Sequence, residues 1–93
     1  MEYPSENSVK DSNGVDIQLG DIILYGQDSY SAPKIGLVVK LYKKYFRMAI
    51  KTTNAIRETT CKLPEYSIVV NFLKNNEEAE KMFGLDQLIE TYL

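Results

Sequence analysis

The stretch that decides the fold is Ile35-Gly36-Leu37-Val38-Val39-Lys40-Leu41-Tyr42, near the middle of a chain of 93 residues. Its side chains alternate with the two-residue period of a β-strand. Strict alternation predicts one face with Ile35, Leu37, Val39 and Leu41, and an opposite face with Gly36, Val38, Lys40 and Tyr42. Residues 45–52 repeat the period, with Phe46, Met48 and Ile50 on one side. The two strands are joined around Lys43-Lys44, and because neither lysine favours a positive φ, we expect a connection longer than a tight turn.

Shorter strands are predicted on both sides of this pair. The turn sequence Asp11-Ser12-Asn13-Gly14 lies between Val9 and an alternating segment at 15–19, which predicts a hairpin. The predicted strands are residues 15–19, 22–26, 35–42, 45–52, 56–63 and 66–73. Their close spacing leaves no room for helical crossovers. The predicted fold class is therefore mainly β, a small antiparallel barrel of five to six short strands over residues 9–74.

The two ends of the chain have a different character. Residues 1–8 are polar and show no periodicity, so they predict a flexible tail without a signal peptide. After Asn75 the apolar residues follow the period of a helix, and acidic residues stand first, where they favour a helix N-terminus. Residues 75–93 thus predict a C-terminal amphipathic helix, packed on the barrel or on a partner, which Gly84 either stops or bends.

Part of the chain resembles the KOW motif of SH3-like barrels. The residues that carry the resemblance are Gly20-Asp21-Ile22-Ile23-Leu24-Tyr25, then a loop, then Lys34-Ile35-Gly36-Leu37-Val38-Val39-Lys40. The resemblance implies an SH3-like β-barrel and a ligand among RNA, ribosomal components, DNA and transcription proteins. In style the chain is also similar to the small accessory proteins of large tailed phages, which use such barrels against host machinery. That likeness implies a bacteriophage protein of the host cytoplasm.

Charge is strongly segregated along the chain. Residues 34–62 hold eight basic residues against the single acid Glu58, a local charge of +7. The preceding residues carry −5 and the following residues −4, so the net charge of −2 hides a basic block between acidic flanks. A local positive field of this kind attracts an anionic partner. The lone Cys61 fits a reducing compartment, in agreement with a cytoplasmic location.

Basic and aromatic residues of the two central strands form the candidate binding site. Cations neutralise phosphates and aromatic rings stack on unpaired bases, so the pattern predicts RNA, with DNA in second place. The predicted nucleic-acid-binding residues are Lys40, Tyr42, Lys43, Lys44, Tyr45, Arg47 and Lys51. A plain solvated strand face remains the alternative reading of the same residues.

A protein-interaction module is the second hypothesis for function. It would inhibit a host defence, toxin or transcription protein, and a protein–RNA complex would satisfy both hypotheses. The predicted partner-contacting residues are Tyr30, Met82, Phe83, Leu88 and Tyr92. The apolar stripe of the terminal helix covers one end of the barrel or forms an interface, so we expect a monomer or a weak dimer.

Composition argues against catalysis. The chain has no histidine, which removes the commonest general base, and with one cysteine it cannot assemble a Cys/His zinc site. Cys61 is expected to be packed and inert, and the three glutamates at 77, 78 and 80 are expected to start a helix rather than hold a cation. The longest apolar runs are strand-sized, so no membrane span is predicted. We therefore expect a non-enzymatic protein without metal or cofactor.

Overall fold

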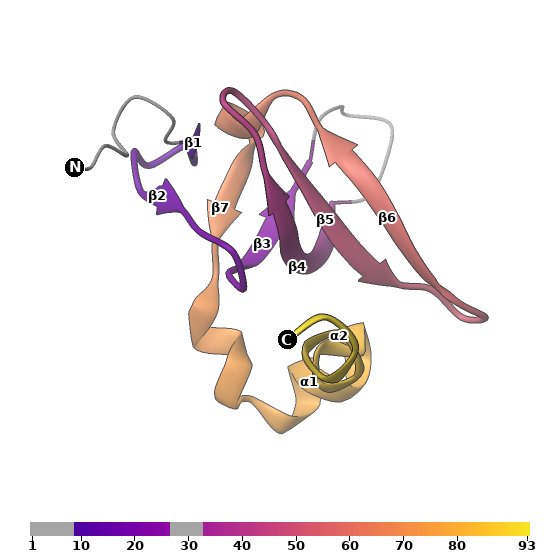
Figure 1. Cartoon of the computed structure of the whole chain (residues 1–93). Helices are drawn as coiled ribbons and strands as arrows, with labels where there is room; N and C mark the ends of the chain where they lie inside the picture. Colours follow the sequence, from indigo (N-terminus) through magenta and orange to yellow (C-terminus); the bar gives the residue numbers. More distant parts are fainter. Residues whose placement is uncertain (1–8, 27–32) are drawn as a thin grey trace.

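The computed structural model describes residues 9–26 and 33–93 and is mainly β, as predicted. Five strands form one antiparallel sheet and two very short strands form a second, with two helices at the C-terminal end (Figure 1). The predicted tail at residues 1–8 lies outside the described residues. The strands are β1 (Val9–Lys10), β2 (Asp16–Ile17), β3 (Ile22–Tyr25), β4 (Lys34–Leu41), β5 (Phe46–Lys51), β6 (Ile56–Cys61) and β7 (Ser67–Val69). The helices are the 3₁₀ turns η2 (Pro64–Tyr66) and η3 (Asn71–Asn75), followed by α1 (Glu77–Phe83) and α2 (Leu85–Tyr92).

The large sheet has the order β6-β5-β4-β3-β7. Strands β3 to β6 are paired with their neighbours in sequence, and β7 returns to pair with β3 at the other edge. The outer side of β7 is covered by the β1–β2 turn: Ser12 N–H donates to Ser67 O at 2.8 Å, and Val69 N–H donates to Asp11 Oδ2 at 2.9 Å. This edge is therefore closed to further strand pairing.

A β-bulge in β4 changes the predicted alternation. Val38 pairs with Met48 but Lys40 pairs with Arg47, so Val39 has no partner of its own on β5. Paired residues share a face, and the bulge thus moves Lys40 from the side of Val38 to the side of Arg47. The prediction for Leu41 was wrong, because Leu41 now lies opposite Phe46 and is 38% exposed. A prediction from strict alternation assumes one residue opposite one residue, so it cannot anticipate a bulge.

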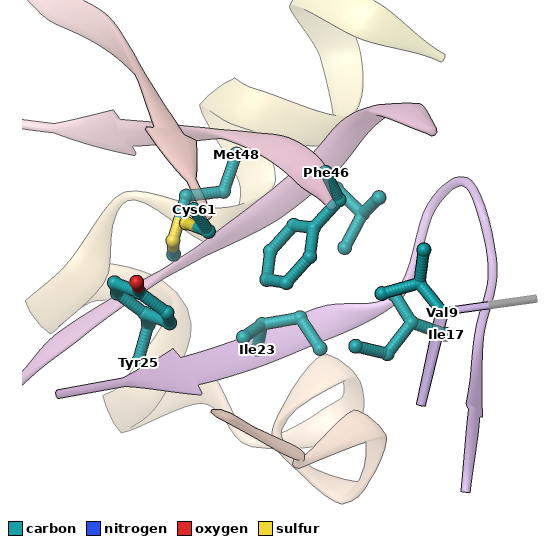
Figure 2. Close-up of a cluster of buried hydrophobic side chains, with 8 residues drawn as sticks. Val9, Ile17, Ile23, Tyr25, Phe46, Met48 and Cys61 are labelled. Atoms are coloured by element: carbon teal, nitrogen blue, oxygen red, sulfur yellow. The ribbon is translucent and has the colours of Figure 1, made fainter. Parts of the chain in front are cut away.

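The sheet is buried on both faces. Figure 2 shows the first core cluster, in which Val9 and Ile17 of the small sheet point toward Phe46 and Ile23. The first core cluster consists of Val9, Ile17, Ile23, Tyr25, Val38, Phe46, Met48 and Cys61. The second core cluster consists of Ile22, Leu37, Ala49, Val70, Leu85 and Leu88, and it packs α2 against the opposite face. Burial on both sides explains the near-continuous apolar run in the middle of β4.

Two predicted strands are shorter than expected. In the segment 15–19 only Ile17 is buried, while Val15 and Leu19 are 47% and 59% exposed. The predicted strand 66–73 is limited to β7, because the chain turns into η3 at Asn71. There the Asn71 side chain, in place of a strand backbone carbonyl, bonds to β3: its Oδ1 accepts the Ile22 N–H at 2.7 Å. Its Nδ2 donates to Asp21 Oδ1 at 3.0 Å.

The C-terminal region forms two helices where one was predicted. Asn76 caps α1 by accepting the Ala79 N–H at 3.0 Å, and acidic residues fill the first turn. Gly84 then adopts a left-handed conformation, with φ of 64°, which ends α1 and begins α2. A Cβ at this position would also lie 2.5 Å from Lys51 Cγ, so both conformation and space favour glycine.

We expect Gly36→Ala to destabilise the fold by about 3 kcal/mol, at the upper end of the range for overpacking a core. A Cβ at Gly36 would lie 2.2 Å from Ala49 O and 2.8 Å from Met48 Cε, and the first of these is backbone that cannot turn away. Urea unfolding followed by circular dichroism measures the effect. Gly26→Ala is the matched control, because its Cβ would meet only Pro33 at ordinary distances of 3.7–3.8 Å. Equal losses in the two variants would contradict the steric argument.

We expect Asp11→Ala to lower the free energy of unfolding by about 3 kcal/mol, because removal of the buried carboxylate leaves three backbone N–H groups without their acceptor. Asp11 is 5% exposed and accepts from Asn13 and Val15 at 2.9 and 2.8 Å, besides Val69. Asp16→Ala is the control. Its exposed ion pair with Lys10, at 2.6 Å, should contribute at most about 0.5 kcal/mol. Thermal or urea denaturation that ranks the two variants in the opposite order would refute this role of Asp11.

Candidate nucleic-acid interface

The connection between β4 and β5 brings two tyrosines and two lysines together. It runs over residues 42–45, and the Tyr42 N–H donates to Tyr45 O at 2.9 Å. The Tyr42 and Tyr45 rings stack, with centroids 4.6 Å apart and an angle of 25° between their planes. Lys43 and Lys44 between them are exposed. Among residues 9–26 and 33–93 only glycines have a positive φ, which agrees with the longer connection expected from the sequence.

Arg47 is tied to the sheet by neighbouring side chains. Its Nε donates to Glu58 Oε1 at 3.2 Å and its Nη1 donates to Thr60 Oγ1 at 3.1 Å, both on β6. Lys40, its cross-strand neighbour on β4, is exposed. The charge of Arg47 is therefore balanced within the sheet, whereas that of Lys40 is open to solvent.

Lys51 lies at the opposite end of β5 from the turn. Its Nζ donates to Thr52 O at 3.0 Å, and its side-chain stem lies against Gly84 between the two helices. Between Lys51 and the turn, α2 reaches the sheet through Tyr92, whose hydroxyl donates to Glu58 Oε2 at 3.1 Å. Burial, and then this bond to Glu58, raise the pKa of Tyr92. The seven predicted residues thus fall into a group at the turn, a tethered Arg47 and a distant Lys51.

Lys62 joins the turn, although the sequence analysis did not include it in the site. It follows Cys61, which pairs with Phe46, and Phe46 follows the turn directly. In Figure 1 the end of β6 passes the β4–β5 turn at the end of the sheet away from the helices. The +7 charge block contained Lys62, but only strand register shows which end of the sheet it reaches. We call Lys40, Tyr42, Lys43, Lys44, Tyr45 and Lys62 the basic turn.

The charges of the basic turn are not neutralised by neighbouring acids. Within the part of the chain that the structure describes, none of its four lysines forms an ion pair. Tyr42 is 36% exposed and Tyr45 is half-buried. In a stacked pair each ring covers one face of the other, so an additional ring can stack only on an outer face.

The residues predicted to contact a protein partner are mostly turned inward. Leu88 has no exposed surface, and Phe83 and Tyr92 pack at the margin of the second core cluster. Met82 alone of the four in the terminal helices is largely exposed, at 76%. Tyr30 lies outside the described residues. The apolar stripe therefore packs on its own sheet, and Leu88 is not available to a partner while α2 is docked.

Over residues 9–26 and 33–93, no three His, Cys, Asp or Glu side chains are grouped so that they could hold a metal ion. The described helices are too short or too polar for any of them to span a bilayer.

Comparison with known proteins identifies a family without a known function. The model of a domain of unknown function, DUF7205, matches residues 9–70, which include all seven strands. The chain therefore belongs to the DUF7205 family. No curated protein and no solved structure matches the chain.

The fold suppresses the reactivity of Cys61. It has no exposed surface and lies in the first core cluster beside Tyr25 (Figure 2). Burial raises the pKa of Cys61 to about 12, and the charge of Lys34 offsets only part of this effect. The thiol stays protonated at neutral pH, as expected of a packed cysteine.

We expect Cys61 to make the fold less stable as pH rises from about 9 to about 12. The unfolded thiol ionises near pH 9 but the folded thiol only near 12, so the unfolded state binds fewer protons in this window. Between pH 8 and pH 10 the loss from this group should be about 1.4 kcal/mol. Urea unfolding at both pH values measures the change in the free energy of unfolding for the parent and for Cys61→Ala. The difference between these two changes is the contribution of Cys61. The same pH dependence in both proteins would exclude Cys61 as its source.

Proposed function

We propose that this member of the DUF7205 family is a non-enzymatic module that binds single-stranded RNA through the basic turn. The observation that carries the proposal is the exposed pair Lys43 and Lys44 at the tip of the turn, next in sequence to the stacked Tyr42 and Tyr45 at the end of the sheet. Lys40 and Lys62 add two further unpaired cations near the same end. Phosphate neutralisation by lysines and base stacking on tyrosines are the two elements of sequence-tolerant RNA binding.

An SH3-like barrel is the architecture that we propose for the strand region. The strand order supports it, because four strands follow in sequence and β7, after the 3₁₀ turn η2, returns to β3. Tyr25 pairs with the start of β4 and Phe46 with its end, yet the two rings pack edge-on with centroids 6.1 Å apart, so the sheet is strongly curved. Gly26 N–H donates to Tyr66 O at 3.2 Å, which extends the pairing of β3 with β7. Such a barrel would hold the β4–β5 turn rigidly at one rim, which lowers the entropic cost of binding.

The distribution of acidic residues supports a one-sided interface. Glu77, Glu78 and Glu80 lie in the first turn of α1. In Figure 1 the helices lie at the end of the sheet opposite the β4–β5 turn. An anionic strand would therefore be attracted to the turn and repelled from the helical end.

Charge reversal of the turn, Lys43→Glu with Lys44→Glu, should abolish RNA binding while the fold persists, since both side chains are exposed. The parent, with about four phosphate contacts, should show a log–log salt slope of about −3 for a single strand. Fluorescence anisotropy with a labelled single-stranded RNA at several salt concentrations measures both quantities.

Arg57→Glu with Lys74→Glu is the matched control, with the same change in net charge on β6 and η3. This control should retain at least most of the parent's affinity. If both double variants lose binding equally, net charge and not the turn is responsible, and the proposal fails. Parent-like binding by the turn variant would also refute it, as would a nuclease-resistant protein complex with no RNA affinity at all.

A further inference from the structure

A polar groove lies at the opposite end of β5 from the basic turn. It has a volume of about 470 Å³ and is formed between the β5–β6 connection and the corner where α1 meets α2. Figure 1 shows the end of β5 running past these two helices. The lining side chains are polar apart from Met82, and they include Lys51, Thr53, Lys81 and Gln87. The volume is within the range of small-molecule sites.

The lining favours a negatively charged ligand. Lys51 comes from the end of β5 and Lys81 from the last turn of α1, so two basic residues that are distant in sequence line one groove. No carboxylate is among its lining residues in the described part of the chain, although Asp86 is exposed on the neighbouring first turn of α2. Two like charges repel each other in an empty groove, and an anion between them removes that repulsion.

The position of Lys51 is fixed by packing. A Cβ built on Gly84 would lie only 2.7 Å from Lys51 Cβ and 2.5 Å from Lys51 Cγ. The aliphatic part of the Lys51 side chain is therefore packed between β5 and the corner where the two helices meet. Its Nζ makes one hydrogen bond, to Thr52 O. An ammonium group has three donors, so two remain for a ligand. A donor that is already held in place loses little side-chain entropy on binding.

The start of α2 adds uncapped backbone donors to the same wall. Gly84 lines the groove and precedes α2, and within the described ranges no side chain caps this helix. The first N–H groups of a helix carry partial positive charge, which favours an anion beside them. Gln87 on the first turn contributes a side-chain amide that makes no hydrogen bond to another described residue.

We propose that this groove binds a phosphate group, with Lys51 and Lys81 as its charged ligands and Gln87 and Thr53 as neutral ones. Phosphate fits because lysines serve as point charges for it and the neutral groups can supply directed hydrogen bonds. The site does not depend on RNA binding at the basic turn. The phosphate belongs either to a free nucleotide or inorganic phosphate, or to the backbone of an RNA strand.

The test is a titration of the ¹⁵N-labelled protein with inorganic phosphate at constant ionic strength, followed by amide chemical shifts. Shifts should saturate at Lys51, Gly84 and Gln87. Lys81→Gln changes an exposed side chain, so it should fold normally and weaken phosphate binding about fivefold. Lys51→Gln should weaken it at least as much, provided that its amide spectrum shows the parent's dispersion.

Lys74→Gln is the matched control on η3, outside the groove, and should bind phosphate as the parent does. Shifts that grow linearly without saturation, or equal weakening by Lys74→Gln and Lys81→Gln, would show non-specific screening and overturn the proposal. The variant Lys43→Glu with Lys44→Glu should retain the groove shifts. This variant therefore distinguishes a failure of the proposed phosphate binding in the groove from a failure of the proposed RNA binding at the basic turn.

Competition then identifies the source of the phosphate. Displacement of inorganic phosphate by a mononucleotide, in the parent and in the turn variant alike, indicates a free nucleotide. Displacement by a single-stranded oligonucleotide that is lost in the turn variant indicates one RNA strand engaging both sites. If neither compound displaces inorganic phosphate that binds saturably, free inorganic phosphate is the ligand of the groove.

Discussion

The close approach of β4 and β5 at Gly36 is the constraint on which the rest of the structure depends. The space where a side chain would begin is occupied by the carbonyl oxygen of Ala49 and by Met48. Only a residue without a Cβ allows the two strands to bend together there. The bulge at Val39 follows within the same strand, and together the two features let the middle of one sheet bury both of its faces.

Burial of both faces decides which cations are available to a ligand. The second face is covered by α2, which is anchored by Leu85 and Leu88 and bonded to Glu58 through Tyr92. Glu58 in turn holds Arg47, so the centre of the predicted basic face is covered and electrostatically balanced. What remains is a cationic turn at one end of β5 and a cationic groove at the other. A single basic surface has become two separate ones.

Much of this could be predicted from residue patterns. The positions of β3 to β6, the turn after Asp11 and the inward packing of the terminal stripe agree with the alternation and periodicity of apolar residues. The predictions that failed concern features that depend on contacts between segments distant in sequence. Leu41 departs from the pattern because of a bulge. Residues 71–73 depart because the Asn71 side chain, not its backbone, accepts the Ile22 N–H, while its amide also donates to the Asp21 carboxylate. Lys62 was omitted because strand register, which places it beside the turn, depends on partners far away in sequence.

The sequence by itself determined the class of fold, the strand-sized segments, the helical end and the concentration of positive charge in residues 34–62. These are local properties, because period, turn chemistry and charge are encoded in neighbouring residues. Only the tertiary structure decided which of those charges meet. Strand register, the docking of α2 and the ion pair of Arg47 with Glu58 join residues from different elements, so they stabilise the protein only after the sheet has packed against its two core clusters. The same charge block that first indicated one binding face is therefore divided between the basic turn and the groove.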